Sequence, residues 1–227
     1  MKEDRTELLY SKDSCARFRE ASVVVVGLGG VGLYALENIA RAGVRKLTVI
    51  DGDAFEESNL NRQLYALSST LGKKKAFAAA ERLADIVPGT EVKAIGEFLT
   101  PDDLAEFIPD DADFIVDAID DIPVKAALIS YALGKGIRII SSMGTARRKD
   151  PSKLLVTTLG RTDCCPLARK LRKLLREEPL SKNVPVVCSK ETPCDVEKGL
   201  PLPSAGMVPA ASGILMAAFV INTLSEL

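Results

Sequence analysis

Residues 22–32 read SVVVVGLGGVG, a β-branched apolar run followed at once by a glycine-rich turn. Gly27, Gly29 and Gly32 have the G-x-G-x-x-G spacing, and a stretch of helical character follows at residues 33–42. Glycines at this spacing let the backbone turn tightly and approach a phosphate, and the start of the next helix offers free N–H groups. The stretch therefore predicts a strand, a phosphate-binding turn and a helix of Rossmann type.

A second strand is predicted at residues 46–50, and it is followed directly by Asp51. An acid at this position commonly binds a ribose hydroxyl. A nucleotide site is thus favoured over a glycine turn with a purely structural role. The motif does not identify the nucleotide, because ATP-binding and dinucleotide-binding folds share it. The residues expected to contact the nucleotide here are Gly27, Gly29, Gly30, Gly32 and Asp51.

Strand-like and helix-like runs alternate along the rest of the chain. The alternation predicts an α/β, Rossmann-like, doubly wound fold with a mostly parallel sheet, helices on both faces and a C-terminal strand/helix extension. We expect a single domain over residues 1–227, with a nucleotide-binding part at 1–144 and a basic substrate and dimer extension at 145–227. The predicted strands are 22–26, 46–50, 91–95, 114–116, 137–141, 154–159 and 184–188, and the predicted helices are 33–42, 73–87, 102–107, 123–133 and 166–177.

Polar side chains that suit a triphosphate follow the second strand. Residues 59–63 read NLNRQ, and a lysine triplet at 73–75 opens a predicted helix. Arg62 and Lys75 can neutralise phosphate oxygens, and the neighbouring amides can fix the chain around them. A nicotinamide dehydrogenase does not need this cluster, so the segment favours ATP over NAD. The candidates added here are Asp53, Asn59, Asn61, Arg62, Gln63 and Lys75.

Two further acids, Asp117 and Asp120, follow the predicted buried strand at 114–116. Ligands of open α/β sheets bind at the carboxyl ends of the strands, where these acids are expected to lie. Carboxylate oxygens at that edge can hold Mg²⁺ against phosphates. Asp117 is therefore a candidate contact to the nucleotide, and Asp120 is the candidate Mg²⁺ ligand.

Composition excludes several classes of protein. The chain has 30 basic residues, 31 acidic residues and no histidine, so it has no overall bias toward nucleic acid or membranes and no histidine-based catalytic triad. The five cysteines are odd in number, and the charged residues 1–7 contain no apolar run, so a reduced, cytoplasmic protein is expected. No Cys-x-x-Cys pair occurs, which argues against a four-cysteine zinc site.

Residues 200–225 contain no charged side chain. Prolines interrupt this segment, and its unbroken apolar run spans only residues 214–221. A membrane-spanning helix needs about 18 or more apolar residues, so we expect a buried C-terminal helix and no membrane partner. The preceding segment at 190–206 is rich in proline and glycine and predicts a mobile loop.

The motifs resemble those of the ubiquitin-activating-enzyme-like superfamily, which includes the bacterial adenylating enzymes of thiamine and molybdopterin biosynthesis. Within it the chain is most similar to a branch that modifies tRNA, because SMG at 142–144 leads to DP at 150–151 and PLA at 166–168 precedes a basic helix. Cys165 stands where that branch has an acid. The superfamily motifs are RTELL at 5–9, the glycine turn, Asp51-x-Asp53, NLNRQ at 59–63, GKKK at 72–75 and DAID at 117–120.

The resemblance implies an enzyme that uses ATP to adenylate the threonyl carboxylate of tRNA threonylcarbamoyladenosine. A nucleophile within the substrate would then close a ring and expel AMP. A homodimer is implied, in which Arg5 reaches the phosphates in the partner subunit. Arg62 and Lys75 would stabilise the charge of the departing pyrophosphate, and Asp120 would position Mg²⁺.

A basic segment supports a tRNA partner. Ten basic residues lie between Thr145 and Arg176, opposed by only two acids, and such a local surplus is typical of a phosphate-backbone footprint. The alternative is an ordinary solvated helix face. With the leucines of helix 166–177 expected in the core, the basic side is left free. The tRNA contacts expected there are Arg169, Arg172 and Arg176.

Three function classes stay open on sequence alone. The first is the tRNA-modifying enzyme, and the second adenylates the C-terminus of a ubiquitin-like sulfur-carrier protein and has a possible sulfur-transfer partner. The third is a nucleotide-binding module without catalysis. The basic segment and the absent cysteine pairs favour the first over the second. The set Arg5, Arg62, Lys75 and Asp120 argues against the third.

The cysteines are a point of departure from the family. Some relatives carry a cysteine, proposed to be catalytic, shortly before the C-terminal helix, whereas residues 199–212 contain none here. Cys194 is the nearest, and we expect it to be a free surface cysteine. Of Cys164 and Cys165, at least one is expected to have a packing role.

Overall fold

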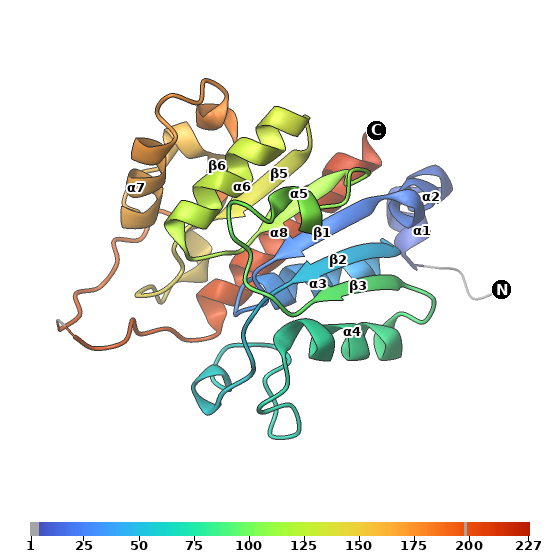
Figure 1. The fold of residues 1–227 in the computed structure, drawn as a ribbon, viewed down its shortest axis with the longest axis horizontal. Coiled ribbons are helices and arrows are strands. Elements are labelled where there is room, and N and C mark those ends of the chain that lie inside the picture. Colours follow the sequence, from blue (N-terminus) through green and yellow to red (C-terminus); the bar gives the residue numbers. More distant parts are fainter. Residues whose placement is uncertain (1–4, 198) are drawn as a thin grey trace.

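The structure is a computed structural model that describes residues 5–197 and 199–227. Residues 1–4, on which part of the expectation about the N-terminus rests, lie outside the described residues. Seven strands form one sheet in the order β3-β2-β1-β4-β5-β7-β6 (Figure 1), and β6 alone among them pairs antiparallel, with β7. The predicted doubly wound, mostly parallel fold is confirmed. The strands are β1 (Ser22–Val26), β2 (Lys46–Ile50), β3 (Glu91–Ile95), β4 (Phe114–Asp117), β5 (Arg138–Ser142), β6 (Leu154–Thr158) and β7 (Pro185–Ser189).

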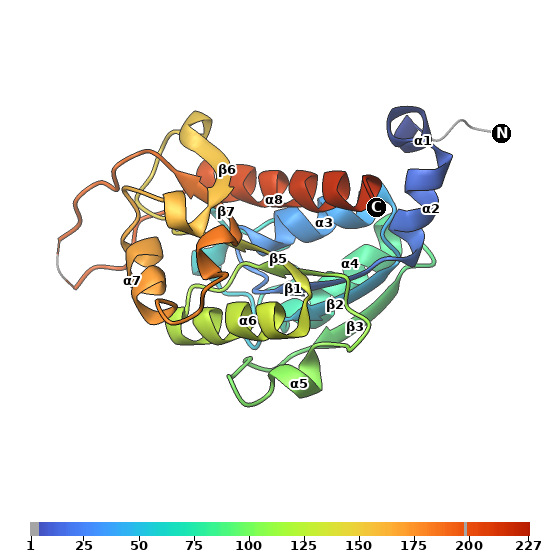
Figure 2. The same cartoon turned by 90° about the horizontal axis from the view of Figure 1, so that it is seen from above.

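Helices cover both faces of the sheet, with α3 and α8 on one side and α5 and α6 on the other (Figure 2). Short 3-10 turns, η1 to η4, lie at Glu57–Asn59, Pro151–Lys153, Leu159–Arg161 and Ser181–Asn183. The helices are α1 (Arg5–Tyr10), α2 (Lys12–Glu20), α3 (Gly32–Ala42), α4 (Lys75–Ile86), α5 (Leu104–Phe107), α6 (Ile122–Lys135), α7 (Pro166–Leu174) and α8 (Met207–Ser225).

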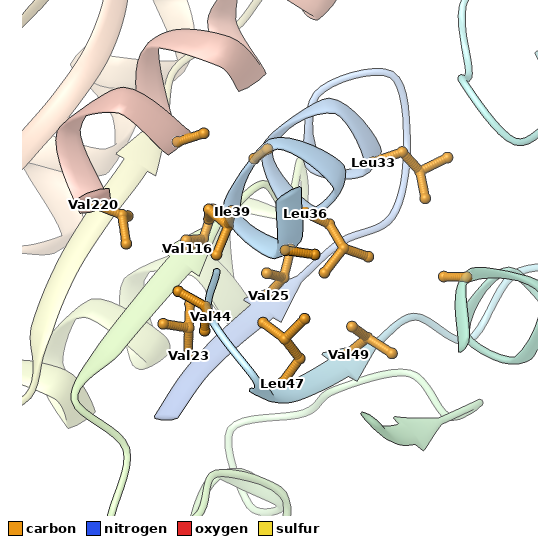
Figure 3. Packing of buried hydrophobic residues seen from close by; sticks show 14 of the residues in the cluster. Val23, Val25, Leu33, Leu36, Ile39, Val44, Leu47, Val49, Val116 and Val220 are labelled. Atoms are coloured by element: carbon orange, nitrogen blue, oxygen red, sulfur yellow. The ribbon is translucent and has the colours of Figure 1, made fainter. Parts of the chain in front are cut away.

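Alternate residues of β1 supply two cores, because successive side chains of a strand point to opposite faces. Val23 and Val25 pack with α3, α4 and α8, and Figure 3 shows them beneath Leu36 and Ile39 of α3. The other valines of β1 pack with α5, α6 and α7. Buried on both faces, β1 holds the glycine turn at a fixed point of the sheet.

The N-terminal helices α1 and α2 are absent from the sequence prediction. Helix α2 is short and polar, and its main apolar anchor is Phe18, which is completely buried. Arg17 ties α2 to the carbonyl groups of Leu224 and Ser225 at the end of α8. The partners of α2 are thus about 200 residues away in sequence, which explains why a local pattern did not reveal it.

The expected buried C-terminal helix is confirmed as α8. Among the described residues it is the one helix long and apolar enough to cross a membrane by length and composition, and half of its apolar window is buried within this fold. Gly213 allows its close approach to α3, since a methyl group at that position would lie 2.3 Å from the carbonyl oxygen of Val31. In this fold α8 is therefore a core helix.

The loop at 190–206 has no helix or strand in its described residues, as predicted, but it is anchored to the rest of the chain. The backbone groups of Arg147 bond to Pro203 and Cys194, and the Arg147 guanidinium donates to the Cys194 carbonyl. The Asn61 amide donates to the Ser204 carbonyl at 2.9 Å. The loop is thus pinned to the NLNRQ segment and to the start of the basic segment.

Candidate active site

The glycine turn follows β1 at the carboxyl edge of the sheet, next to the end of β4. Gly27 has a φ of +88°, and a methyl group there would lie 2.7 Å from the Ala118 carbonyl oxygen. At Gly32 a methyl group would lie 1.8 Å from the Gly27 carbonyl oxygen. Both positions therefore require glycine. Strand order reverses direction between β1 and β4, and this switch point is where doubly wound sheets bind ligands.

Asp51 supports the glycine turn from the end of β2. One carboxylate oxygen accepts the Leu28 N–H at 2.6 Å, and the other accepts the Asp53 N–H at 2.8 Å. Burial raises the pKa of Asp51, and the Lys75 ammonium opposes that shift. The acid predicted to contact the nucleotide thus also shapes the turn that would bind it.

Lys75 is the most enclosed cation of the predicted phosphate cluster. Its ammonium lies 2.9 Å from a carboxylate oxygen of Asp53, and its side chain is 6% exposed whereas that of Asp53 is 53% exposed. Lys74 donates to the Gly52 carbonyl, and Lys73 pairs with Glu81 away from this cluster. Within the lysine triplet, Lys75 is therefore the residue whose ammonium forms an ion pair beyond the carboxyl end of β2.

The guanidinium of Arg62 forms hydrogen bonds with residues of the same loop. Its guanidinium donates to the Ser58 carbonyl at 2.7 Å and to the Asn61 side-chain oxygen at 2.8 Å. Asn59 forms a reciprocal cap with Glu56 at η1, so this predicted nucleotide contact has a structural role in ordering the turn. Asn61 and Asn59 therefore fix the backbone and the arginine, as expected of the amides.

Gln63 is the amide that faces the glycine turn. It is buried, and the nearest atom to a methyl group placed on Gly29 would be its side-chain nitrogen, at 3.9 Å. Its side-chain oxygen has no hydrogen-bond partner among the described residues. An unpaired buried acceptor costs about 1–3 kcal/mol, so a donor group on a bound nucleotide fits this position.

Asp117 differs from its predicted role as a nucleotide contact. Its carboxylate is completely buried, pairs with Lys125 at 2.8 Å and accepts the Ser141 hydroxyl at 2.6 Å. The remaining oxygen accepts the Ile119 N–H at 3.1 Å. Both oxygens are thus used inside the protein. Neither Lys125 nor Ser141 was predicted as part of the site, although a single lysine within the apolar helical run after the strand-end acid was a signal.

Asp120 lies in the turn after β4, on the same edge as the glycine turn, and it is exposed. The Ala118 N–H donates to the Val26 carbonyl at 2.8 Å, so this turn is joined to the end of β1. An exposed carboxylate at the switch point suits a Mg²⁺ ion shared with phosphates. The structure thus brings Asp120, Lys75, Arg62 and the glycine turn to one edge of the sheet.

Arg5 does not belong to that edge. It begins α1, which lies beyond the amino ends of the strands in Figures 1 and 2. Within one chain, Arg5 and the glycine turn are therefore at opposite ends of β1. Any contact of Arg5 with the nucleotide requires a second subunit.

The basic residues of the C-terminal half divide into two groups. Arg169 is exposed on α7, as predicted, together with Lys173, whereas Arg176 is exposed in the turn after the helix and pairs with Glu177. Arg172 is different: its guanidinium bonds to the carbonyl groups of Leu159 and Thr162 and to the Thr162 hydroxyl. The prediction that Arg172 belongs to the free basic face is therefore wrong, because it caps the η3 turn.

Two further side chains near α7 differ in exposure from the sequence prediction: Arg148 is buried and Leu174 is exposed. Arg148 is buried and donates to the carbonyl groups of Gly144, Cys164 and Glu191. Leu174 was expected in the core but is 56% exposed, since α7 ends there. The free basic surface is thus smaller than the sequence suggested.

Cys165 confirms the expected packing role for one of the paired cysteines. It is buried beside Cys188, and a hydrogen bond from the Cys188 thiol lowers the pKa of Cys165 below its ordinary value. The same contact and burial raise the pKa of Cys188. Cys164 and Cys194 are exposed, and none of the five cysteines, all of which lie within the described residues, forms a disulfide.

The doubly wound sheet and the lysine, arginine and amide cluster beside its glycine turn define a Rossmann-type nucleotide-binding protein that is equipped to bind phosphates. The ThiF family model matches residues 4–226, and the chain belongs to the ThiF family.

Among individual proteins, the tRNA threonylcarbamoyladenosine dehydratase of Bacillus subtilis (strain 168) is 35% identical to the chain, with 97% of this chain and 93% of that protein aligned. The crystal structure of E. coli tRNA N6-threonylcarbamoyladenosine dehydratase, TcdA, in complex with ATP matches with a TM-score of 0.91 and 34% identity, covering 97% of this chain and 92% of that one. The complex of the same protein with AMP matches with the same TM-score, identity and coverage. The resemblance to the tRNA-modifying branch is confirmed.

Proposed function

We propose that this chain is an ATP-dependent adenylating enzyme that activates the threonyl carboxylate of tRNA threonylcarbamoyladenosine and releases a cyclised product. The observation that supports this most is the convergence of Lys75, Arg62, Gln63 and Asp120 on the glycine turn at one edge of the sheet. The relatives named for this reaction cover nearly the whole chain. We place the enzyme in the cytoplasm, as a homodimer.

In this mechanism the glycine turn and the start of α3 bind the phosphates through backbone N–H groups. A carboxylate oxygen of the substrate attacks the α-phosphorus, and the bond to pyrophosphate breaks. Arg62 and Lys75 stabilise the negative charge that develops on the leaving group. A nucleophile within the substrate then attacks the activated carbonyl carbon, and AMP leaves. Asp120 would hold Mg²⁺, which would supply charge neutralisation at the phosphates.

The product decides between the two adenylating reactions. Purified protein is incubated with ATP, Mg²⁺ and tRNA that carries threonylcarbamoyladenosine, and the nucleosides are analysed by mass spectrometry. We expect an ATP-dependent loss of one water molecule from the modified nucleoside, and none without ATP. An unchanged nucleoside, together with adenylation of a sulfur-carrier protein ending in Gly-Gly, would show that the substrate is a protein C-terminus instead.

The nucleotide preference is a separate prediction. We expect ATP with Mg²⁺ to bind and NAD not to displace it, because Lys75, Arg62 and Gln63 surround a phosphate site rather than a nicotinamide pocket. Isothermal titration of ATP alone, of NAD alone and of ATP in excess NAD measures both. Binding of NAD without binding of ATP would contradict the assignment of the site.

The basic face of α7 is proposed to bind the tRNA backbone. Its exposed cations Arg169 and Lys173 lie one helical turn apart, so they can follow one line of phosphates. Arg176 follows in the turn after the helix, where it pairs with the exposed Glu177. We expect the triple alanine variant to bind tRNA more weakly and the slope of log K against log salt to become less steep by up to about 2–3. ATP affinity is expected to stay unchanged.

A charge-matched control separates this footprint from general attraction. Lys12, Lys46 and Lys135 lie on elements at the amino edge of the sheet and can be replaced by alanine with the same loss of charge. The control variant is expected to keep the tRNA affinity and the salt slope of the wild type. Equal losses in the two triple variants would mean that α7 is only a solvated face.

A further inference from the structure

Asp117, Lys125 and Ser141 form a buried polar cluster beneath the candidate active site. The side chains of Asp117 and Lys125 have 0% exposure, and their charged atoms lie 2.8 Å apart. The Ser141 hydroxyl bridges them, donating to Asp117 at 2.6 Å and accepting from Lys125 at 3.1 Å. The three residues come from the end of β4, the first turn of α6 and the end of β5, so the cluster joins three elements at the carboxyl edge.

Stability alone does not explain this cluster. Removing two charges from water costs free energy that their attraction only partly returns, and apolar residues of similar volume often replace a buried pair without loss of stability. Neither charge reaches the surface to meet a ligand. A role in fixing the geometry of a neighbouring segment is the remaining use for a buried pair of this kind.

The neighbouring segment is the turn that carries Asp120. Because Lys125 and Ser141 occupy one carboxylate oxygen of Asp117, the other is free to accept the Ile119 N–H at 3.1 Å. The Ala118–Ile119 peptide in turn contacts the glycine turn, within 2.7–3.1 Å of a methyl group placed on Gly27. The cluster therefore supports both the turn before Asp120 and the first glycine of the phosphate-binding loop.

We propose that Asp117, Lys125 and Ser141 are positioning residues that hold the 118–120 turn in the geometry at which Asp120 meets the Mg²⁺–ATP bound at the glycine turn. The inference rests on the proposed function. Asp117 fixes the Ile119 peptide directly, whereas Lys125 and Ser141 act through Asp117 by setting the orientation of its carboxylate.

Two double variants separate positioning from stability. Asp117→Leu with Lys125→Met removes both charges and the acceptor for the Ile119 N–H. Asp117→Asn with Lys125→Met also removes both charges but keeps a side-chain oxygen for that N–H. The readouts are the melting temperature, the Mg²⁺ concentration at half-maximal enhancement of ATP binding by isothermal titration, and the kcat of adenylation. Asp113→Asn is the control, because Asp113 accepts the Ser22 N–H at the other end of β4.

We expect the leucine variant to require at least about tenfold more Mg²⁺ and to lose kcat by about tenfold to 100-fold, the range that a displacement near 1 Å produces. The asparagine variant should recover most of both losses, and the Asp113 variant should match the wild type. Equal Mg²⁺ dependence in both double variants, or losses in each that follow only the fraction of folded protein, would overturn the proposal.

Two further provisions make the test decisive. If the leucine variant does not fold, Ser141→Ala, which keeps both charges and their direct contact, is measured instead. The Mg²⁺ requirement is expected to rise by about threefold, less than in the leucine variant, because only the bridging hydrogen bonds of the hydroxyl are lost. An unchanged requirement in that variant overturns the proposal. Wild-type protein that does not bind Mg²⁺–ATP at all would contradict the proposed function itself, and that outcome is established before any variant is made.

Discussion

The Lys75→Ala variant is expected to form the adenylate about 100- to 1,000-fold more slowly than the wild type, the loss typical for one preorganised group that stabilises transition-state charge. Lys75 is buried, pairs with the half-exposed Asp53 and lies after the carboxyl end of β2, on the edge of the sheet that carries the glycine turn. Its charge is thus held in place before the reaction begins. Single-turnover release of pyrophosphate, measured with saturating ATP and tRNA, gives the rate.

Lys73 provides the matched control for this variant. It belongs to the same lysine triplet but pairs with Glu81 on the exposed side of the chain. Because exposed ion pairs contribute only about 0–1 kcal/mol, Lys73→Ala should fold normally and react at the wild-type rate. If Lys75→Ala also reacts at that rate, the phosphates are not stabilised by this lysine.

Mixing inactive subunits is expected to restore activity. In a homodimer in which Arg5 acts on the partner, a heterodimer of Arg5→Ala and Lys75→Ala subunits contains one complete site. After full exchange at equal concentrations, half of the dimers are mixed and half of their sites are complete, so about one quarter of wild-type activity should return. The position of Arg5 at the amino end of the strands, away from its own glycine turn, is the physical reason.

A second mixture tests whether the recovery comes from Arg5. Lys75 and Asp120 lie on the same edge of one chain, so a heterodimer of Lys75→Ala and Asp120→Ala subunits has no complete site. This mixture should stay inactive under the same exchange conditions. If it recovers as well as the Arg5 mixture, subunit exchange has acted through general stabilisation and Arg5 has no role in trans.

Local sequence patterns predicted the parts of this protein that depend on neighbours in sequence. The glycine turn, the strand before it and the helix after it are set by residues within a few positions of one another, and the structure has them where the spacing placed them. Helix α2 was not predicted, because Arg17 bonds to the distant helix α8 and Phe18 is buried in a core that includes residues of that helix. Its stability depends on tertiary contacts that no local window contains.

Asp117 and Arg172 show a second limit of prediction from the sequence, which concerns the partner of each side chain. An aspartate at the end of a parallel strand has the same sequence context whether it faces a ligand or a buried lysine, and only the fold places Lys125 beneath it. Arg172 has the helical spacing of a free basic face, yet it lies within reach of the η3 carbonyl groups. Residue type and spacing predict which groups gather at an edge, whereas the partner of each group depends on the packing.

The close crossing of α8 on α3 also determines when the apolar face of α3 can be covered during synthesis. Helix α3 begins at the last glycine of the phosphate-binding turn, and the face that it presents to solvent without α8 is apolar. Until residues 207–225 leave the ribosome, this surface is uncovered and available to chaperones or to other nascent chains. The apolar face of α3, which begins at the phosphate-binding turn, is therefore covered only after residues 207–225 have been synthesised and have packed against it.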